Sequence, residues 1–279
     1  MKFRARYCIL ILLLLSPGYS QNVQDSWDTF KQRAKPYYYY LMASNIQNFT
    51  CYLSTQVYIN FMEEMGDTVN TYPLKFIWTR GGKIYYVLQP FPEMENDAER
   101  PKFLEKIQLM KNQFHGFFLD WFNYLIISPL DDIPAGTEAE FRGDSVFVSY
   151  VTAEGGIQAT VRKRFFRSGR LISFEVETTS EKVVNYPDYK EVEGKWLCTG
   201  WNTQIYVDDK VSSGLSTSLE LRKIQNDWFP VRANVMVQTV EKPGEKFLSM
   251  IFLKAYEFNL PLFELEDRQT PDSLSQEDS

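Results

Sequence analysis

The sequence predicts an α+β protein, mainly β, whose antiparallel strands form one curled meander covered by helices. Three observations support this fold class. Apolar and polar residues alternate along many short segments, which is typical of strands with one buried face. Short connections rich in glycine, aspartate and proline separate these segments, as in an antiparallel meander. Two other segments carry apolar residues at spacings of three and four, which indicates helices.

The N-terminal part should contain a helix at 25–44 followed by a long strand. Pro36 should kink or restart this helix. The apolar positions of the helix are Trp27, Phe30, Ala34, Tyr37 and Leu41. From Asn48 to Phe61 the period changes to two, which predicts one strand with a dry face. That face consists of Phe49, Cys51, Leu53, Thr55, Val57, Ile59 and Phe61.

A hairpin and a second helix should come next. The hairpin turns at Gly81-Gly82. Its dry residues are Tyr72, Leu74, Phe76, Trp78, Ile84, Tyr86 and Leu88. After an acidic linker at 90–96, Pro101 suits the first turn of the second helix. The apolar positions of that helix are Phe103, Ile107, Met110, Phe114, Phe117, Trp121 and Leu125.

Eight further strands should form the C-terminal half of the chain. They are expected at 145–153, 157–167, 170–179, 182–191, 195–208, 214–225, 228–241 and 246–259. Tight turns such as Glu193-Gly194 and Asp208-Asp209 join successive strands. The total of about eleven strands is too many for a flat open sheet, so the sheet should curl.

Residues 1–20 have the pattern of a secretory signal peptide: a basic opening, an apolar run at 7–15 and small residues before the cleavage site. An uncleaved membrane anchor is the alternative, but a spanning helix needs about 20 apolar residues. We therefore expect an exported protein without a transmembrane anchor after cleavage, periplasmic in a Gram-negative-type bacterium and secreted otherwise. Residues 21–263 should form one domain, followed by an acidic disordered tail at 264–279.

The composition argues against several function classes. The formal net charge is −6, and cleavage would remove three basic residues, so nucleic acid is a poor partner. His115 is the only histidine, and we expect it to be a partly buried helix residue. With no G-x-S-x-G elbow and no phosphate-binding glycine loop, we expect neither an enzyme nor a cofactor. The pairs Asp131-Asp132 and Asp208-Asp209 could bind a cation, but aspartate is common in turns.

One segment, 162–170, is strongly basic. The alternation directs Arg162 and Arg164 to the wet side of a hairpin and Lys163 to the dry side. Two interpretations are open for this segment. It is either a solvated hairpin or a docking surface for anionic lipid head groups or an acidic partner.

Cys51 and Cys198 remain after cleavage, and an exported protein can form a disulfide between them. The alternation argues against that bond. Cys51 falls on a dry face, whereas Cys198 alternates out of phase with Trp201, which is predicted to be dry. The two sulfur atoms should therefore lie on opposite faces unless a β-bulge changes the register.

The order of these elements, over about residues 25–262, resembles the LolA-like family of periplasmic lipoprotein carriers. Two hairpins add to the resemblance. The first is Phe165-Phe166-Arg-Ser-Gly-Arg-Leu171, and the second runs from Tyr186-Pro-Asp-Tyr189 to Gly194-Lys-Trp-Leu197, where the family commonly continues with proline instead of Cys198. The resemblance implies an incomplete barrel of about this strand number, with helices covering an apolar concave side and no catalytic motif.

The residues themselves predict the same apolar surface, and a sheet with one apolar face must cover it. The wall of a ligand-binding cavity would consist of Phe49, Leu53, Val57, Phe76, Trp78, Val161, Phe165, Trp201, Val231 and Val235. The helix covering this wall carries Phe114, Phe117, Phe118, Trp121 and Phe122. This helix is either a movable lid or a permanently packed core, and the sequence leaves both open.

Two functions follow from the predicted surface. The first is a non-catalytic carrier or sensor of lipid or lipoprotein acyl chains, whose affinity grows by about 0.8 kcal/mol for each buried methylene. The second is an envelope protein-interaction or assembly module with no lipid ligand. A hydrolase is disfavoured because no pairing of a nucleophile with a base is evident.

Overall fold

The computed structural model describes residues 26–89, 100–154, 157–240 and 244–261. The predicted signal peptide and acidic tail lie outside these residues. The strands are β1 Asn48–Thr55, β2 Leu74–Thr79, β3 Ile84–Leu88, β4 Ala139–Arg142, β5 Ser145–Glu154, β6 Ile157–Phe166, β7 Leu171–Glu177, β8 Lys182–Val192, β9 Lys195–Val207, β10 Lys210–Ile224, β11 Asp227–Thr239 and β12 Lys246–Phe258. The helices are α2 Trp27–Ala34, α3 Gln56–Glu64 and α4 Arg100–Trp121, with 3₁₀ turns η1 Lys35–Tyr37 and η2 Leu41–Ala43 and a π-helix η4 Phe122–Ile126.

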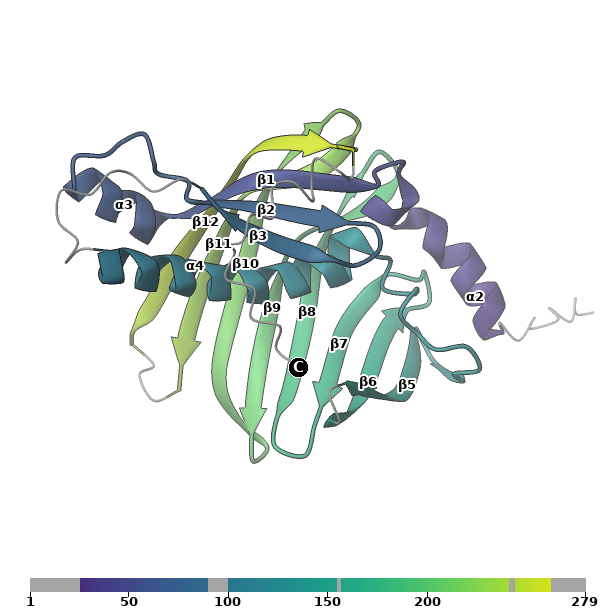
Figure 1. The fold of residues 1–279 in the computed structure, drawn as a ribbon. Coiled ribbons are helices and arrows are strands. Elements are labelled where there is room, and N and C mark those ends of the chain that lie inside the picture. Colours follow the sequence, from purple (N-terminus) through teal and green to yellow (C-terminus); the bar gives the residue numbers. More distant parts are fainter. Residues whose placement is uncertain (1–25, 90–99, 155–156, 241–243, 262–279) are drawn as a thin grey trace, which may run out of the picture.

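All twelve strands form one antiparallel sheet in the order β3-β2-β1-β12-β11-β10-β9-β8-β7-β6-β5-β4. The sheet curls so that β1 to β3 pass over the longer strands, and α4 runs along its concave side (Figure 1). The edge strands β3 and β4 do not pair with each other, so the barrel is not closed. The mainly β, curled antiparallel fold is confirmed, with one strand more than expected.

The additional strand is β4, which covers only four residues. It pairs with β5 alone, and its Glu140 and Arg142 form an ion pair at the surface. Because the segment is short and half charged, its alternation gives no clear signal in the sequence. The eight strands from β5 to β12 agree with the predicted ranges within a few residues.

The long strand predicted for 48–61 is wrong in its second half. β1 ends at Thr55, whose hydroxyl accepts a hydrogen bond from the backbone N–H of Tyr58 at 3.3 Å and caps α3. Tyr58 and Met62 are then buried at helical spacing. The apolar residues of 56–64 fit both periods, and the threonine cap decides between them.

The first predicted helix is also shorter than expected. α2 ends at Ala34, and Pro36 lies in a 3₁₀ turn after which the backbone becomes extended. The Tyr38 hydroxyl then donates to the carbonyl of Gly169 and accepts from the N–H of Leu171, both at 2.7 Å. These two bonds fasten the N-terminal segment to the turn between β6 and β7.

The close contact at that turn requires glycine at position 169. The backbone of Gly169 has φ +105°, and a Cβ atom there would lie 2.2 Å from the Cβ of Ala34. We expect Gly169→Ala to lower the free energy of unfolding by about 3 kcal/mol, from strain and overpacking together. Urea unfolding measures this loss. Gly81→Ala is the control, because nothing lies within 4 Å of its Cβ position, and an equal loss in both variants would contradict the prediction.

Candidate ligand-binding site between α4 and the sheet

Aromatic rings fill the space between α4 and the curled sheet. Phe76 of β2 lies 5.0 Å from Phe114 and 4.8 Å from Phe118, measured between ring centroids. Further round the same buried face of the helix, Phe117 stacks on Trp201 of β9 at 5.9 Å. The helix therefore contacts two distant parts of the sheet through its rings, and we call this set of rings the aromatic layer.

The structure places all the predicted helix residues in or beside the aromatic layer. Phe114, Phe117, Phe118 and Trp121 are at most 5% exposed, and Phe122 is half-buried at the start of the π-helix. In this conformation the rings of the helix cover the concave face, and Phe117 and Trp121 are sealed. A ligand could enter the aromatic layer only if α4 moved.

Part of the predicted wall lies directly against this helix. Phe49 is 5.6 Å from Trp121 and 5.2 Å from Trp78, and Leu53 is fully buried on the same strand. Phe76 and Trp201 complete this part of the wall. These residues come from the paired strands β1 and β2 and from the distant strand β9, which reach the same helix because the sheet curls.

Other predicted wall residues lie on the concave face but away from α4. Phe165 packs on α2, with its ring 5.9 Å from Phe30 and 6.3 Å from Trp27. Val161 is buried in β6 opposite Tyr150. Val235 is half-buried and paired with Thr217. The part of the concave face at Phe165 is thus covered by α2.

Two predicted wall residues do not belong to the wall. Val57 lies on α3 and is 52% exposed, because the helix replaces the predicted strand there. Val231 is the unpaired residue of a bulge, since Glu220 pairs with Arg232 while the next residue of β10 pairs with Pro230. It lines a separate hollow of about 510 Å³ together with Arg232 and Lys254.

A bulge also overturns the face assignment of Cys198. Asp188 of β8 pairs with Gly200, but the next residue, Tyr189, pairs with Cys198, so that Thr199 has no partner. Cys198 is therefore fully buried on the same side as Trp201. Both it and Cys51 are free thiols.

Sequence reasoning missed a buried polar cluster where α4 ends. Asp120 accepts a hydrogen bond from the Trp201 indole, but burial raises the pKa of its carboxyl to about 6. The hydroxyl of Tyr124, in the π-helix, and that of Tyr189, in β8, are buried as well. Periodicity could not predict this cluster, because it joins a π-helix to a bulged strand.

Two ion pairs fasten the loop that follows the π-helix. The buried Lys163 ammonium bonds to Asp132 and, at 2.9 Å, to the carbonyl of Pro129. Lys35 pairs with Asp131 at 2.5 Å. Burial lowers the pKa of Lys163, and the charge of Asp132 opposes this shift. Asp131 and Asp132, the first aspartate pair considered for cation binding, thus bind two lysine side chains.

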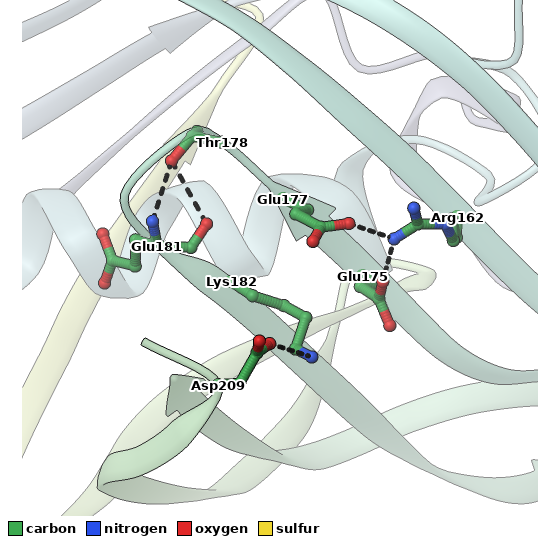
Figure 2. A network of polar contacts seen from close by, with 7 residues as sticks. All are labelled: Arg162, Glu175, Glu177, Thr178, Glu181, Lys182 and Asp209. Atoms are coloured by element: carbon green, nitrogen blue, oxygen red, sulfur yellow. Dashed lines mark hydrogen bonds and ion pairs between the residues drawn. The ribbon is translucent and has the colours of Figure 1, made fainter. Parts of the chain in front are cut away.

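One residue of the basic segment, Arg162, is neutralised on the outer face of the sheet. Arg162 binds both Glu175 and Glu177 of the neighbouring strand (Figure 2). The guanidinium of Arg164 lies over the ring of Phe147 at 5.4 Å. These side chains line a shallow hollow of about 730 Å³ that also contains carboxylates. Arg162 thus has the ion pairs expected of a solvated hairpin, and a docking surface for anionic head groups or an acidic partner stays a prediction.

The remaining candidate residues are at the surface. His115 is exposed on α4, not partly buried. Asp209 of the second aspartate pair lies 3.7 Å from Lys182 (Figure 2). Within the described ranges, no group of three or more histidine, cysteine, aspartate or glutamate residues could hold a metal ion. No helix in that part of the chain has the length and apolar character needed to cross a membrane.

The comparisons with known proteins identify no relative: no family model, no curated protein and no solved structure matches this chain. The resemblance to LolA-like carriers therefore stays a prediction from the order of elements. The fold and the aromatic layer define the molecule as a curled antiparallel sheet that holds a helix on its concave side.

The raised pKa of Asp120 predicts a pH-dependent stability. A carboxyl whose pKa is raised on folding favours the folded state below its unfolded pKa, and this contribution is lost as pH rises through about 6. Asp120→Asn keeps an acceptor for the Trp201 indole without the charge. We expect it to increase the free energy of unfolding by about 1 to 3 kcal/mol at pH 7.5 and to change it little at pH 4. Equal effects at both pH values, in urea unfolding, would contradict this.

The buried ion pair between Lys163 and Asp132 should contribute more to the free energy of unfolding than the exposed ion pairs of Arg162 do. Lys163→Met leaves Asp132 without its buried partner, and we expect a loss of roughly 2 kcal/mol in the free energy of unfolding. The loss is moderate because Asp132 is 29% exposed. Arg162→Met, one residue away on the same strand, breaks exposed ion pairs and should cost less than about 1 kcal/mol. The reverse order in chemical denaturation would disprove the assignment.

Proposed function

We propose that this chain is an exported, non-catalytic binding protein that carries or senses lipid or lipoprotein acyl chains between α4 and the concave sheet. The observation that carries this proposal is the aromatic layer. It is a large apolar surface shared by a helix and a sheet, and its members meet as ring contacts. Because these contacts are between side chains, an acyl chain can take the place of a displaced ring without leaving a backbone N–H or C=O group unpaired.

The energetics of this exchange favour a long apolar ligand. Lifting the rings from the sheet exposes apolar area, and a ligand must bury a similar area to compensate. An acyl chain contributes about 0.8 kcal/mol for each methylene that it buries. Small apolar molecules bury too little area, whereas a long chain can replace several rings. The extent of the aromatic layer therefore favours ligands with a long apolar chain.

The attachments of α4 suggest how the helix would move. Its C-terminal end passes into a π-helix, a feature often found at functional sites, and the loop beyond is fixed by Lys163 and Lys35. Near its start, α4 packs on α3, where Phe103 is 5.7 Å from Tyr58. We infer a hinge at the π-helix, about which the rest of α4 lifts from the sheet.

The two buried thiols can report this movement. Cys51 pairs with Phe76, which contacts Phe114 and Phe118 of α4, whereas Cys198 is near enough to Asp120, at the end of α4, to be affected by its charge. Burial raises the pKa of the Cys198 thiol to about 12 and also raises that of Cys51, so both thiols are unreactive in the closed form. In the chain without residues 1–20, which contain Cys8, the variants Cys198→Ser and Cys51→Ser each keep one cysteine, and we expect the Cys51 thiol to be labelled faster. Labelling of both only at the rate of global unfolding would show that α4 is a fixed core.

The binding function is tested with a fluorescent long-chain acyl ester and by mass spectrometry of lipid retained after mild extraction. If the rings compete with the ligand, Phe118→Ala should bind the ester several-fold more tightly than the unmodified chain does. Leu119→Ala is the control, because this neighbour on α4 is 53% exposed. Absence of retained lipid together with absence of ester binding would rule out the carrier function.

A second candidate function is the envelope protein-interaction module without a lipid ligand. It is favoured by exposed apolar side chains on the last strands, where Met236 pairs with Leu248 and both are at least 37% exposed. Exposed apolar side chains that lie together can mark a protein contact. This function predicts that Met236→Ser with Leu248→Ser abolishes partner binding, whereas Phe118→Ala acts only through stability.

A further inference from the structure

Two buried tyrosine hydroxyls, one in the π-helix and one in β8, have no hydrogen-bond partner among the described residues. They are the hydroxyl groups of Tyr124, which is 1% exposed, and of Tyr189, whose ring is only partly buried. A buried hydroxyl without a partner costs free energy and is uncommon in folded proteins. Other buried polar atoms of the described residues also have no partner, but these two hydroxyls lie in one region, where they can bind one acceptor group together.

The two tyrosines belong to one small region. Tyr189 is the β8 partner of Cys198, and the Tyr124 ring lies 5.4 Å from Trp201, three residues further along β9. Burial raises the pKa of both tyrosines, and Tyr124 and Cys198 contribute to the rise at Tyr189. Tyr124 is thus near enough to affect Tyr189 electrostatically, and both lie beside the part of β9 that carries Trp201 of the aromatic layer.

The surrounding charges limit the chemistry of a ligand at this place. Besides burial, Asp120 and Asp132 raise the pKa of Tyr124, whereas Arg170 lowers that of Tyr189, so charges of both signs lie near the pair. Lys163 is already bound to Asp132 and to the Pro129 carbonyl. Neither a free carboxylate nor an ammonium group is therefore favoured. Two O–H donors fit an uncharged acceptor, such as a carbonyl oxygen.

We propose that the hydroxyls of Tyr124 and Tyr189 donate hydrogen bonds to the carbonyl oxygen of an uncharged ester or amide that carries the acyl chain. This inference rests on the proposed function and specifies the ligand of that site. The head group lies at the hinge, where α4 is anchored, and the chain extends along the aromatic layer toward Phe114 and Phe76. Acylated glycerol and acylated protein carry such an uncharged ester or amide carbonyl, whereas a free fatty acid carries a carboxylate. The site should therefore prefer the first two.

The first test uses the ligand-free protein. Tyr124→Phe and Tyr189→Phe remove hydroxyls that have no partner, so the free energy of unfolding should stay the same or rise. Tyr38→Phe is the matched control, because its hydroxyl has two backbone partners, and it should lose stability. Tyr58→Phe removes another unpartnered hydroxyl, outside the region, and should be neutral. Destabilisation of Tyr124→Phe and Tyr189→Phe to the extent of Tyr38→Phe would overturn the proposal.

The second test measures binding of three probes: a fluorescent polyene fatty acid, its methyl ester and the hydrocarbon diphenylhexatriene. We expect the ester to bind more tightly than the acid at pH 7.5. Tyr124→Phe and Tyr189→Phe should each weaken ester binding roughly fivefold, as for one lost hydrogen bond. Hydrocarbon binding should not change, and Tyr58→Phe should bind all three probes as the unmodified chain does.

The outcomes separate this inference from the proposed function. Unchanged ester binding by both variants would overturn the head-group site and leave the acyl-chain function intact. Equal loss of ester and hydrocarbon binding would assign the tyrosines to packing, which also overturns the site. If the unmodified chain binds neither the ester nor the hydrocarbon, the proposed function fails, and the head-group site fails with it.

Discussion

The packing of aromatic rings between α4 and the sheet is the interaction on which the rest of the structure depends. The helix packs on both Phe76 and Trp201, and these residues belong to strands at distant positions in the sheet. Only a curled sheet can bring both strands to one helix. Because rings are large, they set the separation between helix and sheet, and they provide an apolar volume that another apolar group could occupy.

Irregularities in the sheet and the helices adapt the fold to this packing. The bulge at Thr199 turns Cys198 to the side of Trp201, and the bulge at Val231 moves that residue out of the apolar wall. The π-helix then ends α4 where the loop is fixed by Lys163. The rigid attachment is at one end of the helix and the ring contacts extend along the rest, an arrangement that suits a hinged cover.

Much of the fold was predictable because it depends on local patterns. The eight C-terminal strands and α4 follow from alternation, from tight turns and from apolar spacing. The rings of α4 were likewise identifiable as a cover for an apolar sheet. Predictions failed where two local patterns coincide or where a bulge shifts the phase. The residues after Thr55 fit both a strand and a helix, and Cys198 changes face after one unpaired residue.

The sequence by itself determined the class of the fold, the order of most of its elements and the apolar character of one face, since these depend on residue periodicity and turn chemistry. It did not predict α3 or β4. The tertiary structure alone decided which rings meet, which residues leave the wall, and how Tyr124, Tyr189 and Asp120 come together. The physical reason is that curvature and bulges place residues from distant strands beside one helix. Such contacts arise from the packing of the whole sheet and have no signal in any single segment.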